Sequence, residues 1–135
     1  MRHSLKGKRP LSPHLQIYKI QMTSLLSIAH RGTGMILYAG AFLWALWFAS
    51  LALGSESYGR MQNFLLSPLG LLILGGWSFA FFYHLCNGIR HLLWDVGWGY
   101  DMPTVRYTGW IVIIMSFLLT GLSWGFGMQG GKMWL

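Results

Sequence analysis

The chain has 135 residues, which is about the size of one domain. Hydrophobic residues make up 54% of it and charged residues only 10%, whereas about a quarter of a soluble domain is charged. This composition excludes a soluble globular domain and predicts an integral membrane protein. The formal charge is +7, but no base-stacking or groove-reading motif accompanies it, so we expect no nucleic-acid binding.

The N-terminal segment, residues 1–31, is basic and lies outside the first apolar run. Pro10 and Pro13 interrupt residues 1–20, for which we expect an extended arm on the membrane surface. Residues 21–30 are expected to form a short interfacial helix. This segment has no apolar core of a secretory signal and is too short for a transit peptide. We therefore expect a bacterial, organelle-encoded or already processed chain.

Three apolar runs follow, each long enough to cross the roughly 30 Å hydrocarbon core of a bilayer as a helix. The sequence predicts an all-α fold with transmembrane helices over residues 32–53, 64–89 and 107–128. The connections over residues 54–63 and 90–106 are expected to be polar loops. Residues 129–135 form a short C-terminal tail.

The positive charges are distributed unequally between the two sides of the membrane. Three spans place the N-terminal segment and the second loop on one side, and both carry mostly basic residues. Membrane proteins keep such loops in the cytoplasm or an equivalent compartment. The sequence therefore predicts an inner N-terminus, in the bacterial cytoplasm or mitochondrial matrix. The residues behind this prediction are Arg2, Lys6, Lys8, Arg9, Lys19, Arg31, Arg90 and Arg106, against Arg60 and Lys132 on the other side.

Histidines mark the inner part of the second span. His84 and His91 lie two helical turns apart, about 10 Å along the axis, so both cannot bind one metal ion. His84 is the deeper one, and Gly88 lies one turn from it. A buried imidazole beside a glycine suits haem, whose iron needs an axial ligand and whose flat ring needs close approach to the backbone. The alternative for His84 is a hydrogen bond between helices.

The same interpretation predicts a polar cluster at the inner surface, because antiparallel helices bring the start of the first span beside the end of the second. Cations there would suit haem propionates, although interface solvation explains such histidines equally well. The predicted members are His30, Arg31, Arg90, His91 and Asp95. We expect no other histidine at the depth of His84, so a different chain would supply a second haem ligand.

A second site is indicated near the end of the N-terminal segment. Ser27 and Arg31 are four residues apart and would share one face of a helix, with Ser24 and His30 nearby. A hydroxyl and a guanidinium that face an apolar pocket can hydrogen-bond a quinone carbonyl. Helix capping and lipid headgroup contacts are the simpler alternatives.

Three motifs carry a family resemblance. Residues 9–19 (RPLSPHLQIYK), 27–34 (SIAHRGTG) and 84–95 (HLCNGIRHLLWD) stand in order around the three spans. Over about residues 9–128 the chain closely resembles the cytochrome b subunit of succinate dehydrogenase, the larger membrane anchor of respiratory complex II. The residues of these motifs resemble those of the alphaproteobacterial and mitochondrial branch of the family.

The resemblance implies a three-helix anchor that pairs with a second anchor subunit and holds one haem b with it. An iron–sulfur subunit and a flavoprotein subunit would dock on the inner face, oxidise succinate and pass electrons to ubiquinone. The location implied is the bacterial inner membrane or the mitochondrial inner membrane. Its site residues are His84 as axial iron ligand; His30, Arg31, His91 and Gly88 around the haem and its propionates; and Ser27, Arg31, Ile28 and Ser24 at the quinone.

Two other functions stay open at this point. The anchor of a fumarate reductase would run the same chemistry in reverse. A haem-free structural anchor would use His84 only for packing. In each case, including the leading one, the chain itself performs no succinate chemistry.

Overall fold

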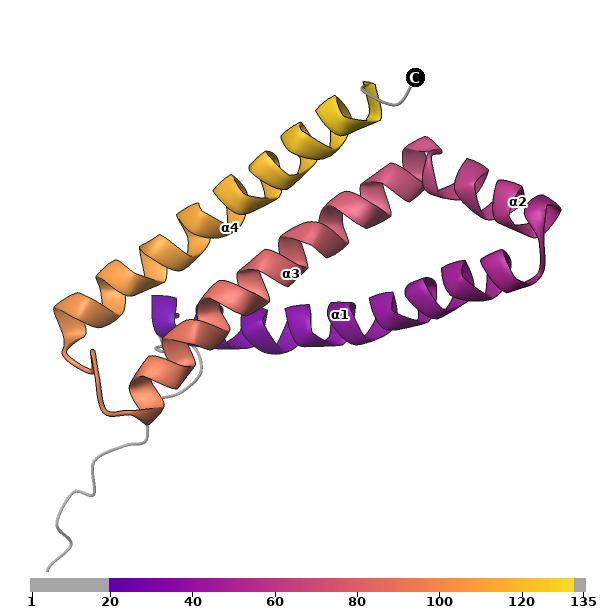
Figure 1. The fold of residues 1–135 in the computed structure, drawn as a ribbon. Coiled ribbons are helices and arrows are strands. Elements are labelled where there is room, and N and C mark those ends of the chain that lie inside the picture. Colours follow the sequence, from indigo (N-terminus) through magenta and orange to yellow (C-terminus); the bar gives the residue numbers. More distant parts are fainter. Residues whose placement is uncertain (1–19, 133–135) are drawn as a thin grey trace, which may run out of the picture.

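A computed structural model describes residues 20–132, with side chains up to residue 129. The predicted surface arm over residues 1–19 lies outside the described residues. Four helices make up the described chain: α1 (Met22–Ala52), α2 (Ser55–Leu65), α3 (Pro68–Asp95) and α4 (Met102–Lys132). Figure 1 shows α3 running antiparallel to α1 and α4, which it contacts on either side.

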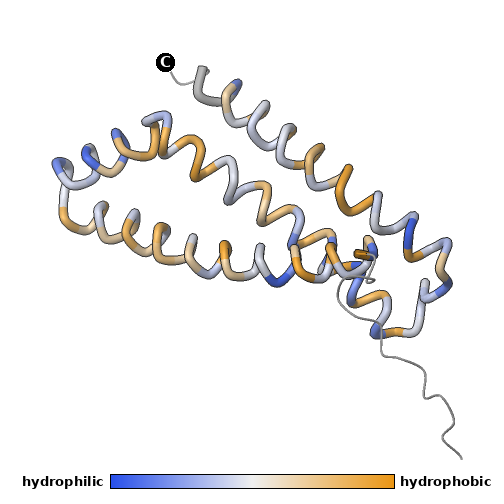
Figure 2. The backbone as a smooth tube through the Cα atoms, turned by 180° about the vertical axis from the view of Figure 1, so that it is seen from behind, coloured by the Kyte–Doolittle hydropathy of each residue, from blue (hydrophilic) through white to orange (hydrophobic). Residues whose placement is uncertain are grey.

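Three of these helices are long and apolar enough to cross a membrane: Met22–Ala52, Pro68–Asp95 and Met102–Gln129. The predicted all-α fold with three spans is confirmed. Most of their large apolar side chains are exposed, as expected for surfaces that face lipid or other subunits. In Figure 2, hydrophilic positions gather on α2 and at the opposite end of the bundle.

The first span and the expected interfacial helix are one continuous helix, α1, that begins at Met22. Gly32 does not break it. The Thr33 hydroxyl lies 2.9 Å from the carbonyl oxygens of both Ala29 and His30 and donates back along the helix at this point. His30 therefore lies two turns inside a long helix.

The connection over residues 54–63 was expected to be a loop, and this expectation is wrong, because Ser55–Leu65 forms helix α2. Gly54, with φ of 102°, turns the chain out of α1, a conformation that glycine adopts without strain. Side-chain pairs four residues apart then support the helix. Glu56 lies 3.8 Å from Arg60, and Gln62 donates to the hydroxyl of Tyr58 at 2.6 Å.

The second loop is also shorter than residues 90–106, because α3 continues to Asp95 and α4 already begins at Met102. Asp101 caps α4. Its Oδ2 accepts hydrogen bonds from the backbone N–H of Thr104 at 3.1 Å and from the Thr104 hydroxyl at 2.6 Å. At the other end of α3, Ser67 accepts a hydrogen bond from the N–H of Gly70, and Pro68 occupies the first turn.

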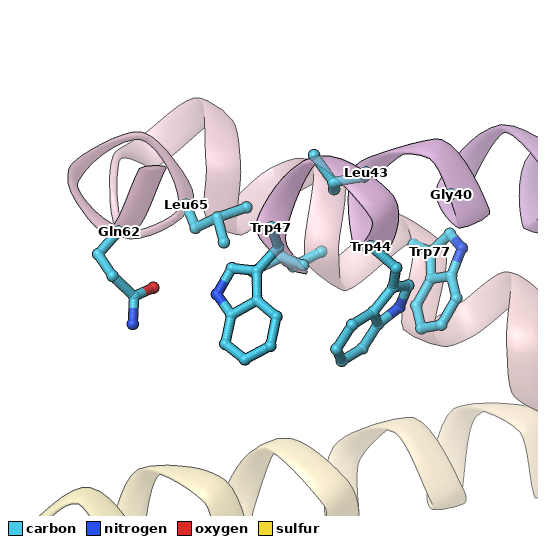
Figure 3. A pocket seen from close by; sticks show the side chains of 8 residues that line it. Gly40, Leu43, Trp44, Trp47, Gln62, Leu65 and Trp77 are labelled. Carbon is cyan, nitrogen blue, oxygen red and sulfur yellow. The ribbon is translucent and has the colours of Figure 1, made fainter. Parts of the chain in front are cut away.

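The two ends of the bundle differ. At one end α1, α3 and α4 meet around a small buried core of Leu26, Tyr83 and Val112. At the other end α1 and α3 diverge and α2 bridges them (Figure 1). An apolar cavity of about 300 Å³ lies in this fork, and Figure 3 shows the indoles that border it. Its lining residues are Gly40, Leu43, Trp44, Trp47, Gln62, Leu65, Leu74 and Trp77.

Candidate functional site

Three histidines meet between α1 and α3, at the end of the bundle away from α2. The rings of His30 and His84 are stacked, with centroids 3.9 Å apart and planes 8° apart. The His91 ring lies 5.1 Å from that of His30 and is tilted by 50°. We call these three residues the histidine cluster. The expectation that no other histidine reaches the depth of His84 is corrected, because the continuous α1 places His30 directly against it.

The hydrogen bonds of His84 define its tautomer. Its Nδ1 lies 3.1 Å from the carbonyl oxygen of His30 and 3.3 Å from the Thr33 hydroxyl. A carbonyl only accepts, and the Thr33 hydroxyl already donates to backbone carbonyls, so Nδ1 of His84 carries the proton. In the neutral ring Nε2 is then the unprotonated nitrogen, whose lone pair can bind a metal ion.

Two glycines lie against this cluster, in different places. A Cβ added to Gly34 on α1 would lie 3.2 Å from Cε1 of His84. The absence of a side chain at Gly34 therefore leaves space for the imidazole. A Cβ added to Gly88 would make ordinary contact with His30, at 3.8 Å from its Cε1. Gly88 therefore lies beside His30, and the glycine that meets the His84 ring is Gly34.

His30 has an unused polar atom. Its Nδ1 is buried and has no hydrogen-bond partner, although native proteins satisfy the great majority of such atoms. His30 thus keeps an unpaired ring nitrogen, and its ring adjoins two other imidazoles.

Ser27 and Arg31 come together on α1 as expected from their spacing. The guanidinium Nη2 of Arg31 donates to the Ser27 hydroxyl at 3.4 Å. Arg31 and Ile28 are exposed, whereas Ser24 and Ser27 are half-buried. This face of α1 thus presents one cation, hydroxyl groups and an apolar side chain, close in sequence to the histidine cluster.

The expected polar cluster is smaller than predicted. Arg90 instead donates to Thr108 and to the carbonyl of Val105 on α4. Asp95 is exposed at the last residue of α3. Within residues 20–129 the only ion pair joins Glu56 and Arg60, so Asp95 pairs with neither Arg90 nor Arg31.

Three residues at the site had no predicted role: Thr33, Gly34 and Asn87. Asn87 is fully buried and lies 3.5 Å from the ring of His91. A signal for it was present, since an amide in an apolar span, three residues before Arg90 and four before His91, shares their helix face. The contacts of Thr33 and Gly34 with His84 depend on where α1 crosses α3, and the sequence does not predict that crossing.

Known proteins match this chain over most of its length. The family model for the succinate dehydrogenase/fumarate reductase transmembrane subunit matches residues 6–123. The succinate dehydrogenase cytochrome b556 subunit of Rickettsia bellii is 47% identical over 123 residues, which cover 91% of this chain and 96% of that protein. The mitochondrial cytochrome b560 subunit of Sus scrofa succinate dehydrogenase is 38% identical over 117 residues, or 85% of this chain and 69% of that one.

A third relative, the succinate dehydrogenase cytochrome b556 subunit of Paracoccus denitrificans, is 35% identical over 118 residues, which cover 87% of this chain and 91% of that protein. Fold and site together define a multi-pass helical membrane protein with a histidine cluster between two of its spans. The chain belongs to the family of succinate dehydrogenase/fumarate reductase transmembrane subunits, which confirms the resemblance of its motifs.

Proposed function

We propose that this chain is the cytochrome b membrane anchor of a succinate:ubiquinone oxidoreductase, respiratory complex II. In this role it holds haem b together with a second anchor subunit and forms part of the site where ubiquinone is reduced. The observation that carries the proposal is the hydrogen bonding of His84, whose Nδ1 donates to the carbonyl of His30 at 3.1 Å and whose Nε2 is left as a ligand. Metal-binding histidines are oriented in this way by a backbone carbonyl.

The residues around His84 fit a haem. Gly34 leaves the imidazole its room, and the unpartnered Nδ1 of His30 offers a polar contact beside it. In the proposal His84 is the axial ligand, and His30, Arg31, His91 and Gly88 lie around the macrocycle and its propionates. Haem b, when bound, supplies a one-electron redox centre at its iron.

The stacking of His30 on His84 supports a shared haem. A haem held by two imidazoles would have to lie between them. Rings stacked at 3.9 Å leave no space for it, so His30 and His84 are not a ligand pair for one haem. A second anchor subunit supplies the other ligand, and this chain forms half of the site.

The quinone site is proposed on the face of α1 that carries Ser24, Ser27, Ile28 and Arg31. The Arg31 guanidinium and the Ser27 hydroxyl, 3.4 Å apart, can both donate to one carbonyl oxygen of a quinone. Ile28 provides apolar contact, since 63% of its surface is exposed. Because this face is open, neighbouring subunits complete the pocket.

The family supports a proposal for the partners and for the direction of the reaction. An iron–sulfur subunit and a flavoprotein subunit would dock at the end that carries the N-terminal segment and deliver electrons from succinate to the quinone. The relatives are named succinate dehydrogenase subunits, which favours succinate oxidation over fumarate reduction.

Arg31→Leu in the assembled complex tests the quinone role. Loss of a hydrogen bond from a charged donor costs about 1.5–3 kcal/mol, so ubiquinone reduction by succinate should fall about 10- to 150-fold. Succinate oxidation with a soluble dye as acceptor should not change. Arg60→Leu, which removes an exposed arginine from α2, is the matched control. Unchanged ubiquinone reduction in Arg31→Leu would refute this role.

A further inference from the structure

Asn87 connects the histidine cluster to helix α4. It lies on α3 between His84 and His91, and none of its surface is exposed. Its Oδ1 accepts from Nη1 of Arg90 at 3.4 Å. Its Nδ2 lies 3.5 Å from the carbonyl oxygen of Leu26 on α1 and 3.5 Å from Nε2 of His91. One amide thus meets a cation, a carbonyl and an imidazole.

The neighbours of Asn87 allow only one orientation of its amide. A guanidinium has donors only, so the atom that faces Arg90 is the amide oxygen. A carbonyl has only acceptor capacity, so the atom that faces Leu26 is the amide nitrogen. Both neighbours therefore require the same orientation of the amide. The amide nitrogen is therefore also the atom that faces His91, and its second N–H donates to Nε2 of that ring.

Arg90 is itself held from α4. Its Nε donates to the Thr108 hydroxyl at 3.0 Å and its Nη2 to the carbonyl of Val105 at 2.9 Å. Its guanidinium carbon lies 4.0 Å from the centre of the Trp94 ring, and only 4% of the residue is exposed. A buried arginine with three fixed contacts cannot turn to release Asn87 without leaving donors unpaired.

We propose that Arg90 and Asn87 are positioning residues that hold His91 as the neutral tautomer, with its proton on Nδ1. A ring nitrogen that accepts a hydrogen bond cannot carry a proton, so Nε2 of His91 is unprotonated. The groups that face His91 are the ring of His30 from α1 and Asn87 and Trp94 from its own helix. Helix α4 acts through uncharged partners of Arg90, namely Thr108 and the Val105 carbonyl.

This inference rests on the proposed function for its consequence. If haem propionates lie beside His30, Arg31 and His91, then Arg31 supplies the positive charge and His91 supplies only a neutral N–H donor. The tautomer itself follows from the hydrogen bonds of the chain and stands without haem or quinone.

Nitrogen-15 NMR of the assembled complex with labelled histidine, reduced with dithionite at neutral pH, tests the proposal. The His91 signals are assigned by their loss in His91→Gln. We expect an unprotonated Nε2 and a protonated Nδ1 for His91 in the unchanged protein. A proton on Nε2 of His91 would overturn the proposal.

Two substitutions show that Asn87 is the cause. In Asn87→Asp both side-chain oxygens only accept, so we expect His91 to gain a proton on Nε2. Asn63→Asp, at an exposed asparagine of α2, is the matched control and should leave the His91 signals unchanged. An Asn87→Asp complex whose His91 keeps an unprotonated Nε2 would also contradict the proposal.

The optical spectrum of the same samples separates this inference from the proposed function. A complex without a haem band but with the expected His91 tautomer would refute haem binding and leave the positioning role intact. A complex with the haem band but a proton on Nε2 of His91 would refute the positioning role and leave haem binding intact.

Discussion

The two ends of the helix bundle are held together in different ways. At the end with the histidine cluster, polar groups on three helices bind one another, and most of these bonds fix the orientation of a ring or an amide. At the α2 end, helices α1 and α3 diverge, and contacts among Trp44, Trp47 and Trp77 border the cavity (Figure 3). Aromatic packing there stabilises the fork without selecting one chemical state.

The difference between the hydrogen-bonded end and the aromatic end indicates where chemistry can occur. A hydrogen-bonded imidazole has a defined tautomer and a defined free nitrogen, which ligand binding requires. The indole Nε1 of Trp77, by contrast, is buried without a partner and lies against Gly40. Substitutions at the histidine end should therefore change the properties of the site as well as stability, whereas those at the α2 end should change stability alone.

The largest expected effect on stability is that of Arg90→Leu. It removes two hydrogen bonds between α3 and α4 and leaves the buried Oδ1 of Asn87 unpaired. Bonds between membrane helices are worth about 0.6–2 kcal/mol each, and an unsatisfied buried group costs about 1–3 kcal/mol more. We expect the complex to lose on the order of 3 kcal/mol in a detergent unfolding titration. Arg106→Leu, at an exposed position of α4, should lose almost nothing; equal losses in both variants would contradict this account.

A pair of glycine substitutions sharpens the comparison. In Gly40→Ala the new Cβ would overlap the indole of Trp77, which must move, at a cost of about 1–3 kcal/mol. Gly34→Ala places its Cβ 3.2 Å from Cε1 of His84, so the ring shifts only slightly. We expect Gly40→Ala to lower the unfolding midpoint more, and Gly34→Ala alone to change the haem midpoint potential. A larger loss of stability in Gly34→Ala, together with a changed haem potential in Gly40→Ala, would contradict the proposed difference between the two ends.

The smallest effect concerns the cap of α4. Hydrogen bonds from the Thr104 hydroxyl and then from its backbone N–H hold the pKa of Asp101 below its ordinary value. The stabilisation is therefore fully present above the unfolded-state pKa of about 3.9 and is lost as pH falls through the lower folded-state pKa. The melting temperature of the unchanged complex should fall slightly more between pH 6 and pH 3 than that of Asp101→Asn. Asp95→Asn, at an exposed aspartate of α3, should follow the unchanged complex.

The sequence predicts the parts of this structure that depend on local pattern. Three apolar runs give the three spans, and a spacing of four residues places Ser27 beside Arg31. Helix α2 was missed because a polar segment of this length with Gly54 and Gly59 has the composition of a loop. Its helix depends on side-chain pairs such as Glu56 with Arg60 and on the distance that the fork must bridge.

The details of the histidine cluster could not be predicted from spacing. Whether His30 meets His84 depends on how α1 crosses α3, and that crossing is set by packing around Leu26 and Tyr83. The orientation of Arg90 depends likewise on Thr108, which is distant in sequence. Contacts between helices decide the meeting of His30 with His84 and the orientation of Arg90. The pattern of a single sequence does not predict such contacts.

The reduced-minus-oxidised optical spectrum of the complex, recorded during a redox titration, tests the central claim most directly. In His84→Leu the haem band and its midpoint potential should change, since ligation from this chain would fall to His30, whose ring lies 3.9 Å away. The band should disappear when His30→Leu is added. Trp77→Leu, at the α2 end, should keep both band and potential. A His84→Leu complex with an unchanged band and potential would contradict the account.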